Sequence, residues 1–480
     1  MQQLREIATV FESRGYSLTS SIFETMKKFK LKTLCHQSGI QKAQGFSTTE
    51  IITLLIMLPI MALKSVHQLY RSEYKNKAEM QKDALYRLKN NEHHSWRRLL
   101  YAVAKGFTKL VKPENESDES EKKKTAIVFD DTTDARVGYK MENISYIYDH
   151  VTKRTTYGYK TLAMGYFDGM TLRPLDFTVH TEKKLERKKA KKQYKKEVNP
   201  KSPGGKRRKE AKMTKIKAAV QMIKRAVKNG FTADYVLCDS WFTSEELISA
   251  VRKIKGGAMH IIAGVKNGNQ KYGYNGSLFN AKEIIALLKK SSSPHRCRRL
   301  GINYYNAVVS YKNVGTVKLA MCRYPRQKKW RVFITTDTEI DFIEMMETYG
   351  IRWTIEVMFR ECKQYLQLGA CQSQDFDAQI ASITITLILY TLLAYLKRME
   401  SYETLGELFL LTQQDVCEKN MAERLWALFE ELLAFMIEAV SAHDSMDIKE
   451  FAQSKEYAFV KEIFESSFLV RQMNSVNKAA

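Results

Sequence analysis

Two short apolar runs that each end in aspartate constrain the fold of this chain more than any other feature. Residues 125–129 (TAIVF) run into Asp130, Asp131 and two threonines, and residues 235–238 (YVLC) run into Asp239. A short apolar run bounded by polar residues is typical of a strand buried in a sheet. The pattern therefore predicts an α/β fold in which two neighbouring strands deliver carboxylates at their carboxyl ends.

The residues around these runs extend the same core. Further strand patterns follow at residues 144–149, 156–166, 172–180, 260–265 and 330–335, and helical patterns at residues 212–229, at 245–254 and from Asp341 onward. Residues 266–329 are mostly strands and turns, with glycine at several turns. We therefore expect an α/β core over residues 125–265, a β-rich insertion over 266–329, and completion of the core over 330–372.

Both ends of the chain are expected to be helical, over residues 1–115 and 373–480. Residues 47–50 (STTE) form a capping-box pattern at the start of an apolar run, and Pro59 is expected to kink that helix. The polar residues 112–124 predict a linker between the first helical region and the core.

Two shorter helices, at residues 85–90 and 95–105, flank a tight turn. His93 and His94 lie in this turn, and because they are adjacent we place both on the surface. The pair resembles a helix-turn-helix DNA reader, with Arg97 and Arg98 as DNA contacts, although an ordinary helical hairpin gives the same pattern. Residues 1–115 are therefore interpreted as a DNA-binding region.

The overall charge narrows the class of partner. The formal net charge is +25, which favours polyanions, meaning nucleic acid or an anionic membrane. The seven cysteines form no CxxC pair and no signal peptide precedes them, so a reducing cytosol is expected rather than a zinc knuckle or a secreted fold. Residues 380–396 are apolar near the lower length limit of a membrane span, and we interpret them as a buried core helix.

Residues 183–215 are the most basic part of the chain. Sixteen of these thirty-three residues are Lys or Arg, and prolines and glycines interrupt the run. We expect this insert to be mobile without a partner and to contact DNA phosphates through Lys206, Arg207 and Arg208. A solvated loop or helix is the alternative.

Residues 348–363 (TYGIRWTIEVMFRECK) predict a helix with an unusual polar face. At about 100° per residue, Tyr349, Arg352, Glu356 and Lys363 fall within a sector of roughly 60°. A carboxylate surrounded by cations and an aromatic ring suits a phosphate ester held beside a metal ion. Local ion pairs on a solvated face are the alternative.

Asp131, Asp239 and Glu356 together make an oxygen-rich cluster, with Asp130 as the alternative to Asp131. Such a ligand set suits Mg²⁺ or Mn²⁺ rather than zinc. Two such ions would activate a water or a 3′-hydroxyl and stabilise the leaving oxygen in a phosphoryl transfer.

The chain resembles the DDE transposases of bacterial insertion sequences, in particular the cut-and-paste group with a Tyr-x2-Arg-x3-Glu-x6-Lys signature. Tyr349, Arg352, Glu356 and Lys363 meet every spacing of that signature, and the surroundings of Asp131 and Asp239 are similar to the family's first two acidic motifs. The resemblance covers residues 85–370. It implies a ribonuclease H-like core, cleavage at terminal inverted repeats and strand transfer.

The resemblance also implies a role for each matching residue. Asp131, Asp239 and Glu356 match metal ligands, Tyr349 and Arg352 match residues that hold the phosphate near a flipped base, and Lys363 matches a DNA-backbone contact. Trp330 is similar to the aromatic residue that stacks on the flipped base, with Trp241 as its rival. We add Arg360, on the same helix, as a DNA contact.

The sequence therefore predicts a transposase that uses two Mg²⁺ or Mn²⁺ ions. Its expected partners are double-stranded DNA, as terminal repeats and target, and further copies of itself in a dimer or larger synapse, with no membrane. We place it in the bacterial cytoplasm at the nucleoid. The alternatives are a structure-selective nuclease with the same core, a transposase-derived DNA-binding protein without activity and, more distantly, a membrane-surface protein.

Overall fold

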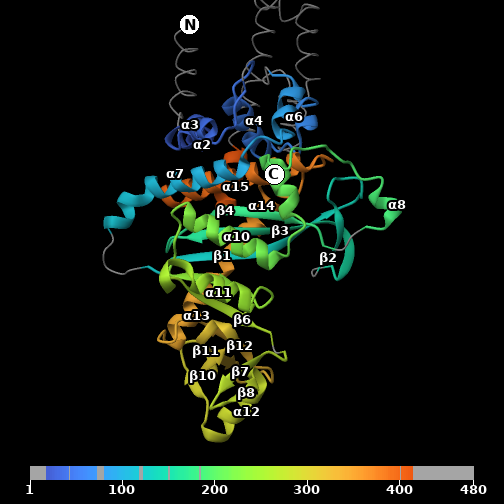
Figure 1. Ribbon diagram of the computed structural model, residues 1–480. Coiled ribbons are helices and arrows are strands. Elements are labelled where there is room, and N and C mark those ends of the chain that lie inside the picture. Colours follow the sequence, from blue (N-terminus) through green and yellow to red (C-terminus); the bar gives the residue numbers. More distant parts are fainter. Residues whose placement is uncertain are drawn as a thin grey trace, which may run out of the picture. The chain divides into compact units, whose positions relative to one another are not determined.

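The computed structural model describes residues 18–42, 44–72, 80–117, 123–149, 152–182, 185–266, 268–400 and 402–414. Residues 22–408 form one compact unit, drawn in colour in Figure 1, and residues 1–21 with 409–480 form a second. The predictions for residues 1–17 and 415–480, including most of the C-terminal helical region, lie outside the described residues. The architecture below is that of the first unit.

A large mixed sheet forms the centre of this unit. Its main path runs β2-β3-β1-β5-β6-β12-β11-β10-β7-β8, with β4 paired to β3 and β9 to β10. The strands are β1 (Ala126–Arg136), β2 (Ser145–Asp149), β3 (Arg154–Phe167), β4 (Leu172–His180), β5 (Tyr235–Cys238), β6 (His260–Val265), β7 (Lys271–Tyr274), β8 (Ser277–Asn280), β9 (His295–Cys297), β10 (Ile302–Tyr311), β11 (Gly315–Arg323) and β12 (Arg331–Thr335).

The order β4-β3-β1-β5-β6 positions the acidic residues. β1 is parallel to β5 and β5 to β6, whereas β3 is antiparallel to both β1 and β4. β1 pairs with β5 only through Ala126, Ile127 and Val128, and it continues to Arg136 after β5 has ended at Cys238. Asp130 and Asp131 therefore lie inside a strand rather than at its end, next to the point where the neighbouring strand stops.

Helices pack on both faces of this sheet and, in the N-terminal part of the unit, on other helices. They are α2 (Leu18–Lys28), α3 (Leu31–Gln37), α4 (Thr48–Ile60), α5 (Val66–Leu69), α6 (Lys82–Lys89), α7 (Trp96–Ser117), α8 (Arg187–Ala190), α9 (Pro203–Glu210), α10 (Lys215–Lys228), α11 (Glu245–Arg252), α12 (Ala281–Ser291), α13 (Phe342–Gly350), α14 (Trp353–Gln364) and α15 (Phe376–Met399). Apolar residues of α10 and α11 join Ile127 and Phe129 in one buried cluster. α14 packs against β1 and β4, and α15 against β4.

α7 and α15 are the long helices of the core and lie side by side in Figure 1. α7 buries Leu99, Leu100 and Phe107 and packs on α3, α15 and β4, as an ordinary core helix does. It also extends to Ser117, so the first residues of the predicted linker are helical. α15 is apolar and long enough to cross a membrane, but 94% of its apolar window is buried inside the protein, in agreement with a core helix.

The N-terminal helices confirm one local prediction and correct two others. Ser47 accepts a hydrogen bond from the Glu50 amide and Glu50 returns one to the Ser47 amide, which completes the capping box. Pro59 lies in the last turn of α4, so it coincides with the end of the helix instead of a kink in its middle. His94 is 6% exposed, not a surface residue, and burial lowers its pKa to about 4.

Residues 266–329 add strands to the same sheet. In the chain, β7 to β11 and helix α12 follow β6 and precede β12, and they appear in yellow in Figure 1. Because β12 pairs with β6 on one side and β11 on the other, the added strands continue the core sheet. The chain then returns through α13 and α14 to the face of β1.

The segment predicted as one helix over 348–363 consists of two helices. α13 ends at Gly350 and α14 begins at Trp353. Between them, successive backbone amides from Ile351 to Ile355 bond to carbonyls three residues earlier, with the exception of Trp353. Three-residue spacing is the tighter 3₁₀ pattern, and short stretches of it within helices often mark functional positions.

Candidate active site

Asp130 and Glu356 are brought together by one arginine. Asp130 lies on the face of β1 that α14 covers, and Arg352 stands at the start of α14. Arg352 Nη1 donates to Asp130 Oδ2 at 3.1 Å, and Nη2 lies 2.6 Å from Glu356 Oε1. A single guanidinium therefore bridges a carboxylate of the sheet and a carboxylate of the helix.

Asp239 adds a third carboxylate from the neighbouring strand. It directly follows β5, which is parallel to β1. Burial and the negative charge of Asp239 raise the pKa of Asp130 to about 7, although the Asp131 amide and Arg352 act in the opposite direction. Two acidic residues thus share Arg352, a third carries negative charge beside Asp130, and the region is short of positive charge.

This shortage fits a divalent cation. The donors are all carboxylate oxygens, the type that Mg²⁺ and Mn²⁺ prefer. The pKa of Asp130 is raised by burial and by the negative charge of Asp239, and a cation held by these two residues would offset both effects. Within the described ranges, however, no three His, Cys, Asp or Glu residues are arranged to hold a metal ion together. Glu356 is instead held by Arg352.

Asp131, the residue preferred from sequence, lies on the opposite face of β1. Successive side chains of a strand alternate between faces, so Asp130 and Asp131 cannot serve the same site. Lys215 Nζ lies 2.5 Å from Asp131 Oδ2 and 2.7 Å from Glu182 Oε1. The geometry therefore favours Asp130, the alternative residue, as the partner of Asp239 and Glu356.

The remaining signature residues lie along the same helices. Tyr349 lies in the last turn of α13 against Phe333, with the Arg352 guanidinium 5.7 Å from its ring, and burial raises its pKa to about 12. Lys363 Nζ donates to the Thr133 carbonyl of β1 at 2.8 Å. Arg360 is exposed on α14. Arg352 and Lys363 therefore contact β1 although the helix is interrupted, whereas Tyr349 lies against β12.

The two candidate stacking aromatics have different surroundings. Trp330 is 8% exposed and packs in the core against Tyr305, with Arg323 over its ring. Trp241 is 45% exposed, and its amide donates to Asp239 Oδ1 at 2.8 Å. Only an exposed ring offers a face to an incoming base, so the structure favours Trp241 over Trp330.

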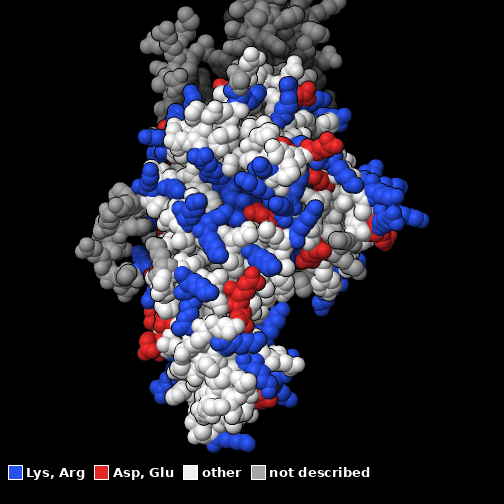
Figure 2. All heavy atoms as spheres, in the orientation of Figure 1, with Lys and Arg blue, Asp and Glu red and all other residues white. Residues whose placement is uncertain are grey.

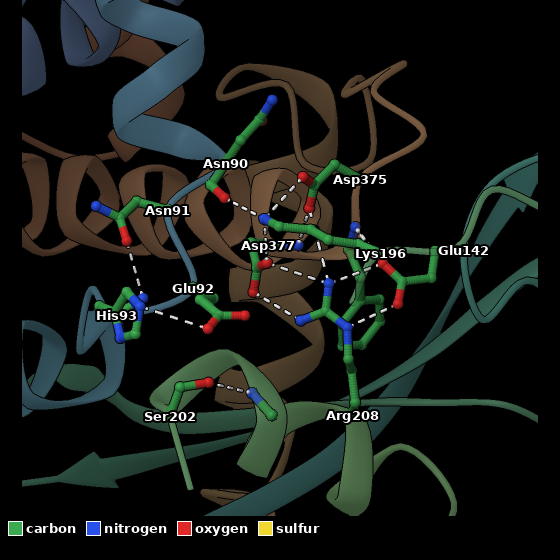
Figure 3. Close-up of polar contacts among 12 residues, drawn as sticks. Asn90, Asn91, Glu92, His93, Glu142, Lys196, Ser202, Arg208, Asp375 and Asp377 are labelled. Carbon is green, nitrogen blue, oxygen red and sulfur yellow. Dashed lines mark hydrogen bonds and ion pairs between the residues drawn. The ribbon is translucent and has the colours of Figure 1, made fainter. Parts of the chain in front are cut away.

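The basic insert is folded and tied to the core, contrary to the expected mobile segment. Figure 3 shows Arg208 of α9 between two carboxylates. Its guanidinium donates to both Glu142 oxygens, at 2.6 and 2.7 Å, and to both Asp377 oxygens, at 2.9 and 3.1 Å. Lys196 reaches Asp375 and Asp377 in the same cluster. Arg208 is therefore a structural residue and does not face DNA.

Arg97 and Arg207 are also engaged inside the protein. Arg97 pairs with Asp176 at 2.8 Å and Glu210 at 2.5 Å, and Arg225 pairs with the same two acids. Arg207 is 5% exposed and donates to the Phe177 carbonyl. Of the five basic residues assigned to DNA outside the signature helices, only Arg98 and Lys206 are exposed.

Two family models match the chain. Residues 205–392 match a transposase DDE domain, and residues 38–273 match a DDE superfamily endonuclease. Both matches support a DDE transposase. The first spans Asp239, Arg352 and Glu356, and the second spans Asp130 and Asp239. The comparison with curated proteins gave no match.

Two residues near this site were missed in the sequence. Lys215 follows the N-cap Thr214 of α10, pairs with Asp131 and places its ammonium 4.9 Å from the Trp241 ring. Trp353 follows Arg352 directly and is 59% exposed. The sequence signal for Trp353 was its place between Arg352 and Glu356 of the signature, whereas its exposure is visible only in the structure.

Proposed function

We propose that this chain is a cut-and-paste transposase of the Tyr-x2-Arg-x3-Glu-x6-Lys group. It cleaves DNA at the ends of an insertion sequence and joins those ends to a target. The observation that carries the proposal is that Arg352 joins Asp130 of β1 to Glu356 of α14, while Asp239 after the parallel strand β5 lies close enough to raise the pKa of Asp130. The two family matches support the same class of enzyme.

Asp130, Asp239 and Glu356 are the residues that would hold Mg²⁺ or Mn²⁺, two ions in all. Such ions, when bound, lower the pKa of a water or 3′-hydroxyl and neutralise charge that develops on the phosphate. The protein residues orient this site. Arg352 holds Asp130 and Glu356 on one side of the sheet, and the Trp241 amide fixes the Asp239 carboxylate.

The DNA end would lie over the middle of β1 and the carboxyl end of β5. Lys363 and Arg360 on α14 supply positive charge on one side, and Trp241 supplies an exposed ring on the other. A base removed from the duplex gains stacking energy on such a ring. Tyr349 and Arg352 stand closest to the carboxylates, where they would position the reacting phosphate.

The strand order β4-β3-β1-β5-β6, with β1, β5 and β6 parallel, supports a ribonuclease H-like core for this enzyme. β7 to β11 then form its insertion between the second aspartate and the glutamate. We place the enzyme in the cytoplasm, where it acts on double-stranded DNA at the nucleoid. Joining two transposon ends requires both to be held together, so a dimer or larger synapse is its working form.

The decisive experiment uses a duplex that carries the DNA flanking the coding region. Wild-type protein and Glu356→Gln are incubated with Mg²⁺, and strand breaks and joined products are mapped on sequencing gels. Glu361→Gln is the matched control, because it removes a carboxylate from the same helix outside the cluster. We expect cutting and joining by wild type and by the control, and neither by Glu356→Gln.

Other outcomes identify the alternative proteins. Equal cutting by wild type and Glu356→Gln would contradict the assignment of Glu356. Metal-dependent nicking of generic branched DNA, without joined products, would indicate a structure-selective nuclease. Tight DNA binding with no metal-dependent product would indicate a transposase-derived binding protein.

A further inference from the structure

A basic pocket lies apart from the carboxylate cluster, among α7, α9, α10 and the start of α15. Its volume is about 240 Å³. Its lining includes the basic residues Arg97, Arg98, Lys206, Arg207 and Arg225. Figure 2 shows Lys and Arg side chains gathered on the same surface, over α7 and α10. Arg225 follows Lys215 by ten positions on α10, which separates the pocket from Asp131 by roughly 15 Å along the helix.

Three donors of this lining have no hydrogen-bond partner among the described residues. They are Trp96 Nε1, Arg207 Nη2 and Arg225 Nη2, each of them a buried atom. Trp96 is 3% exposed and Arg207 is 5% exposed. A buried donor without a partner destabilises a protein, so such donors normally meet an acceptor.

The acids around the pocket do not supply that acceptor. Asp176 and Glu210 pair with Arg97 and Arg225. Arg207 Nη1 forms only long ion pairs, at 3.8 Å with Asp176 and 3.9 Å with Glu210, and its Nη2 has no hydrogen-bond partner among the described residues. Three arginines therefore share two carboxylates, and one positive charge remains in excess.

The other charged groups of the lining leave this excess in place. Asp377 is occupied by Arg208 and Lys196. Burial lowers the pKa of His94 to about 4, so this histidine is neutral at physiological pH. Burial and the charge of Arg97 lower the pKa of Arg207 to about 9, as expected for a guanidinium short of counter-charge.

We propose that this pocket binds a phosphate group. A phosphate presents several acceptor oxygens and up to two negative charges, which match the unpaired donors and the excess guanidinium. The pocket has the volume of about eight waters at roughly 30 Å³ each, so it admits the anion with part of its hydration shell. Arg98 and Lys206 are the exposed cations at its lining and would complete the contact.

Two sources supply the same chemistry, a backbone phosphate of bound DNA and a free phosphate ion. The inference does not rest on the proposed transposase activity, because phosphate binding is measured without metal and without cleavage. A failure of one leaves the other standing.

The test titrates inorganic phosphate into the full chain by isothermal calorimetry, with sodium chloride at equal ionic strength as the blank. Trp96→Phe removes one unpaired N–H and keeps an aromatic ring. The double variant Arg98→Gln/Lys206→Gln removes two positive charges at the pocket. Lys209→Gln/Lys224→Gln is its matched control, since both lysines are exposed on α9 and α10 and neither lines the pocket.

We expect wild type and the lysine control to bind phosphate with similar affinity. Each pocket variant should bind about tenfold more weakly, because one charge-assisted hydrogen bond contributes about 1.5 kcal/mol or more. The proposal is overturned if wild type binds no phosphate beyond the chloride blank, or if the lysine control loses as much affinity as the pocket variants.

Competition with duplex DNA distinguishes the two sources. If the pocket receives a backbone phosphate, inorganic phosphate competes with the duplex beyond its ionic-strength effect, and the pocket variants lose more DNA affinity than the lysine control. If it receives a free phosphate ion, calorimetry still separates the variants while their DNA affinities stay equal to that of the control.

Discussion

The carboxylate cluster at Asp130 and the arginine cluster at Arg207 are opposite in charge balance. Around Asp130, Arg352 pairs with two acidic residues and Asp239 adds a third negative charge, so positive charge is lacking. Around Arg207, three arginines share Asp176 and Glu210, so negative charge is lacking. Both regions are rich in ion pairs, and only the imbalance indicates what each would take up, a cation in the first and an anion in the second.

The ion pairs around Arg208 form a third cluster, in which the charged side chains are paired with one another. Arg208 and Lys196 meet Glu142, Asp375 and Asp377 with short contacts at every group. Every charged side chain of this cluster has an ion-pair partner, and its one excess negative charge lies at the start of α15, where the helix amides stabilise a carboxylate. A high density of Lys and Arg in the sequence therefore does not by itself identify a DNA-binding surface.

The largest expected effect separates Asp130 from Asp131. Asp130→Asn should reduce DNA cleavage by about a thousandfold or more, because it removes a ligand from the charge-deficient cluster. Asp131→Asn should reduce cleavage by less than about tenfold, since Asp131 pairs with Lys215 on the other face of β1. Cleavage rates with Mg²⁺, alongside thermal unfolding of both variants, measure the difference. A larger loss of cleavage in Asp131→Asn than in Asp130→Asn would identify Asp131 as the metal ligand instead.

This first comparison also explains what sequence reasoning could and could not provide. The apolar runs predicted β5 and β6 with the observed bounds, because local composition and turn residues determine such strands. The choice between Asp130 and Asp131 depends on how far β1 extends past β5, which is set by pairing with distant residues. Adjacent identical side chains carry no signal about the face they occupy.

The prediction of a mobile basic insert and the prediction of one continuous signature helix were wrong for the same reason. Arg208 finds Glu142 and Asp377 at separations of 66 and 169 residues, so no local pattern could show its partners. The interruption between α13 and α14 depends on tight hydrogen bonds that the helical periodicity does not encode. The signature spacing nevertheless identified Arg352 and Glu356 correctly as neighbours. Both lie at the start of α14, so the break before this helix does not change their separation.

The second prediction compares two neighbouring arginines of α9. Arg208→Met should destabilise the protein by about 3 to 5 kcal/mol, because Glu142 and Asp377 lose their shared partner while buried. Arg207→Met should cost about 1 kcal/mol, since its buried charge is poorly compensated in the native state. Urea denaturation of both variants measures this. Equal losses would mean that the Arg207 cluster is as well balanced as the Arg208 cluster.

The third prediction concerns Trp241 and Trp330, the two candidate base-stacking residues. Trp241→Ala should weaken binding of a DNA end with an unpaired base by about 1 to 3 kcal/mol and leave stability nearly unchanged, because its ring is exposed. Trp330→Ala should instead destabilise the fold by about 3 to 5 kcal/mol, because it leaves a cavity in the core. Fluorescence anisotropy and thermal unfolding separate the two effects. Normal end binding by Trp241→Ala would exclude its stacking role.

The smallest expected effect tests the Asp131 face of β1 through His180. This histidine is 1% exposed, contacts Thr178 and the Met213 carbonyl, and lies near Lys215. Burial and the positive charge of Lys215 lower its pKa to about 4.

The unfolded chain therefore binds a proton at His180 between about pH 6.5 and pH 4 while the folded chain does not, so stability falls as the pH falls through this window. From pH 7 to pH 5 the loss from this residue is about 2 kcal/mol. Urea denaturation at both pH values measures it, with His180→Asn as the control that lacks the titrating group. The variant should be less stable at pH 7 and less sensitive to pH. If wild type and His180→Asn lose the same stability on acidification, the surroundings of His180 do not keep it neutral. The buried packing around Lys215 and Asp131 would then differ from that in this structure.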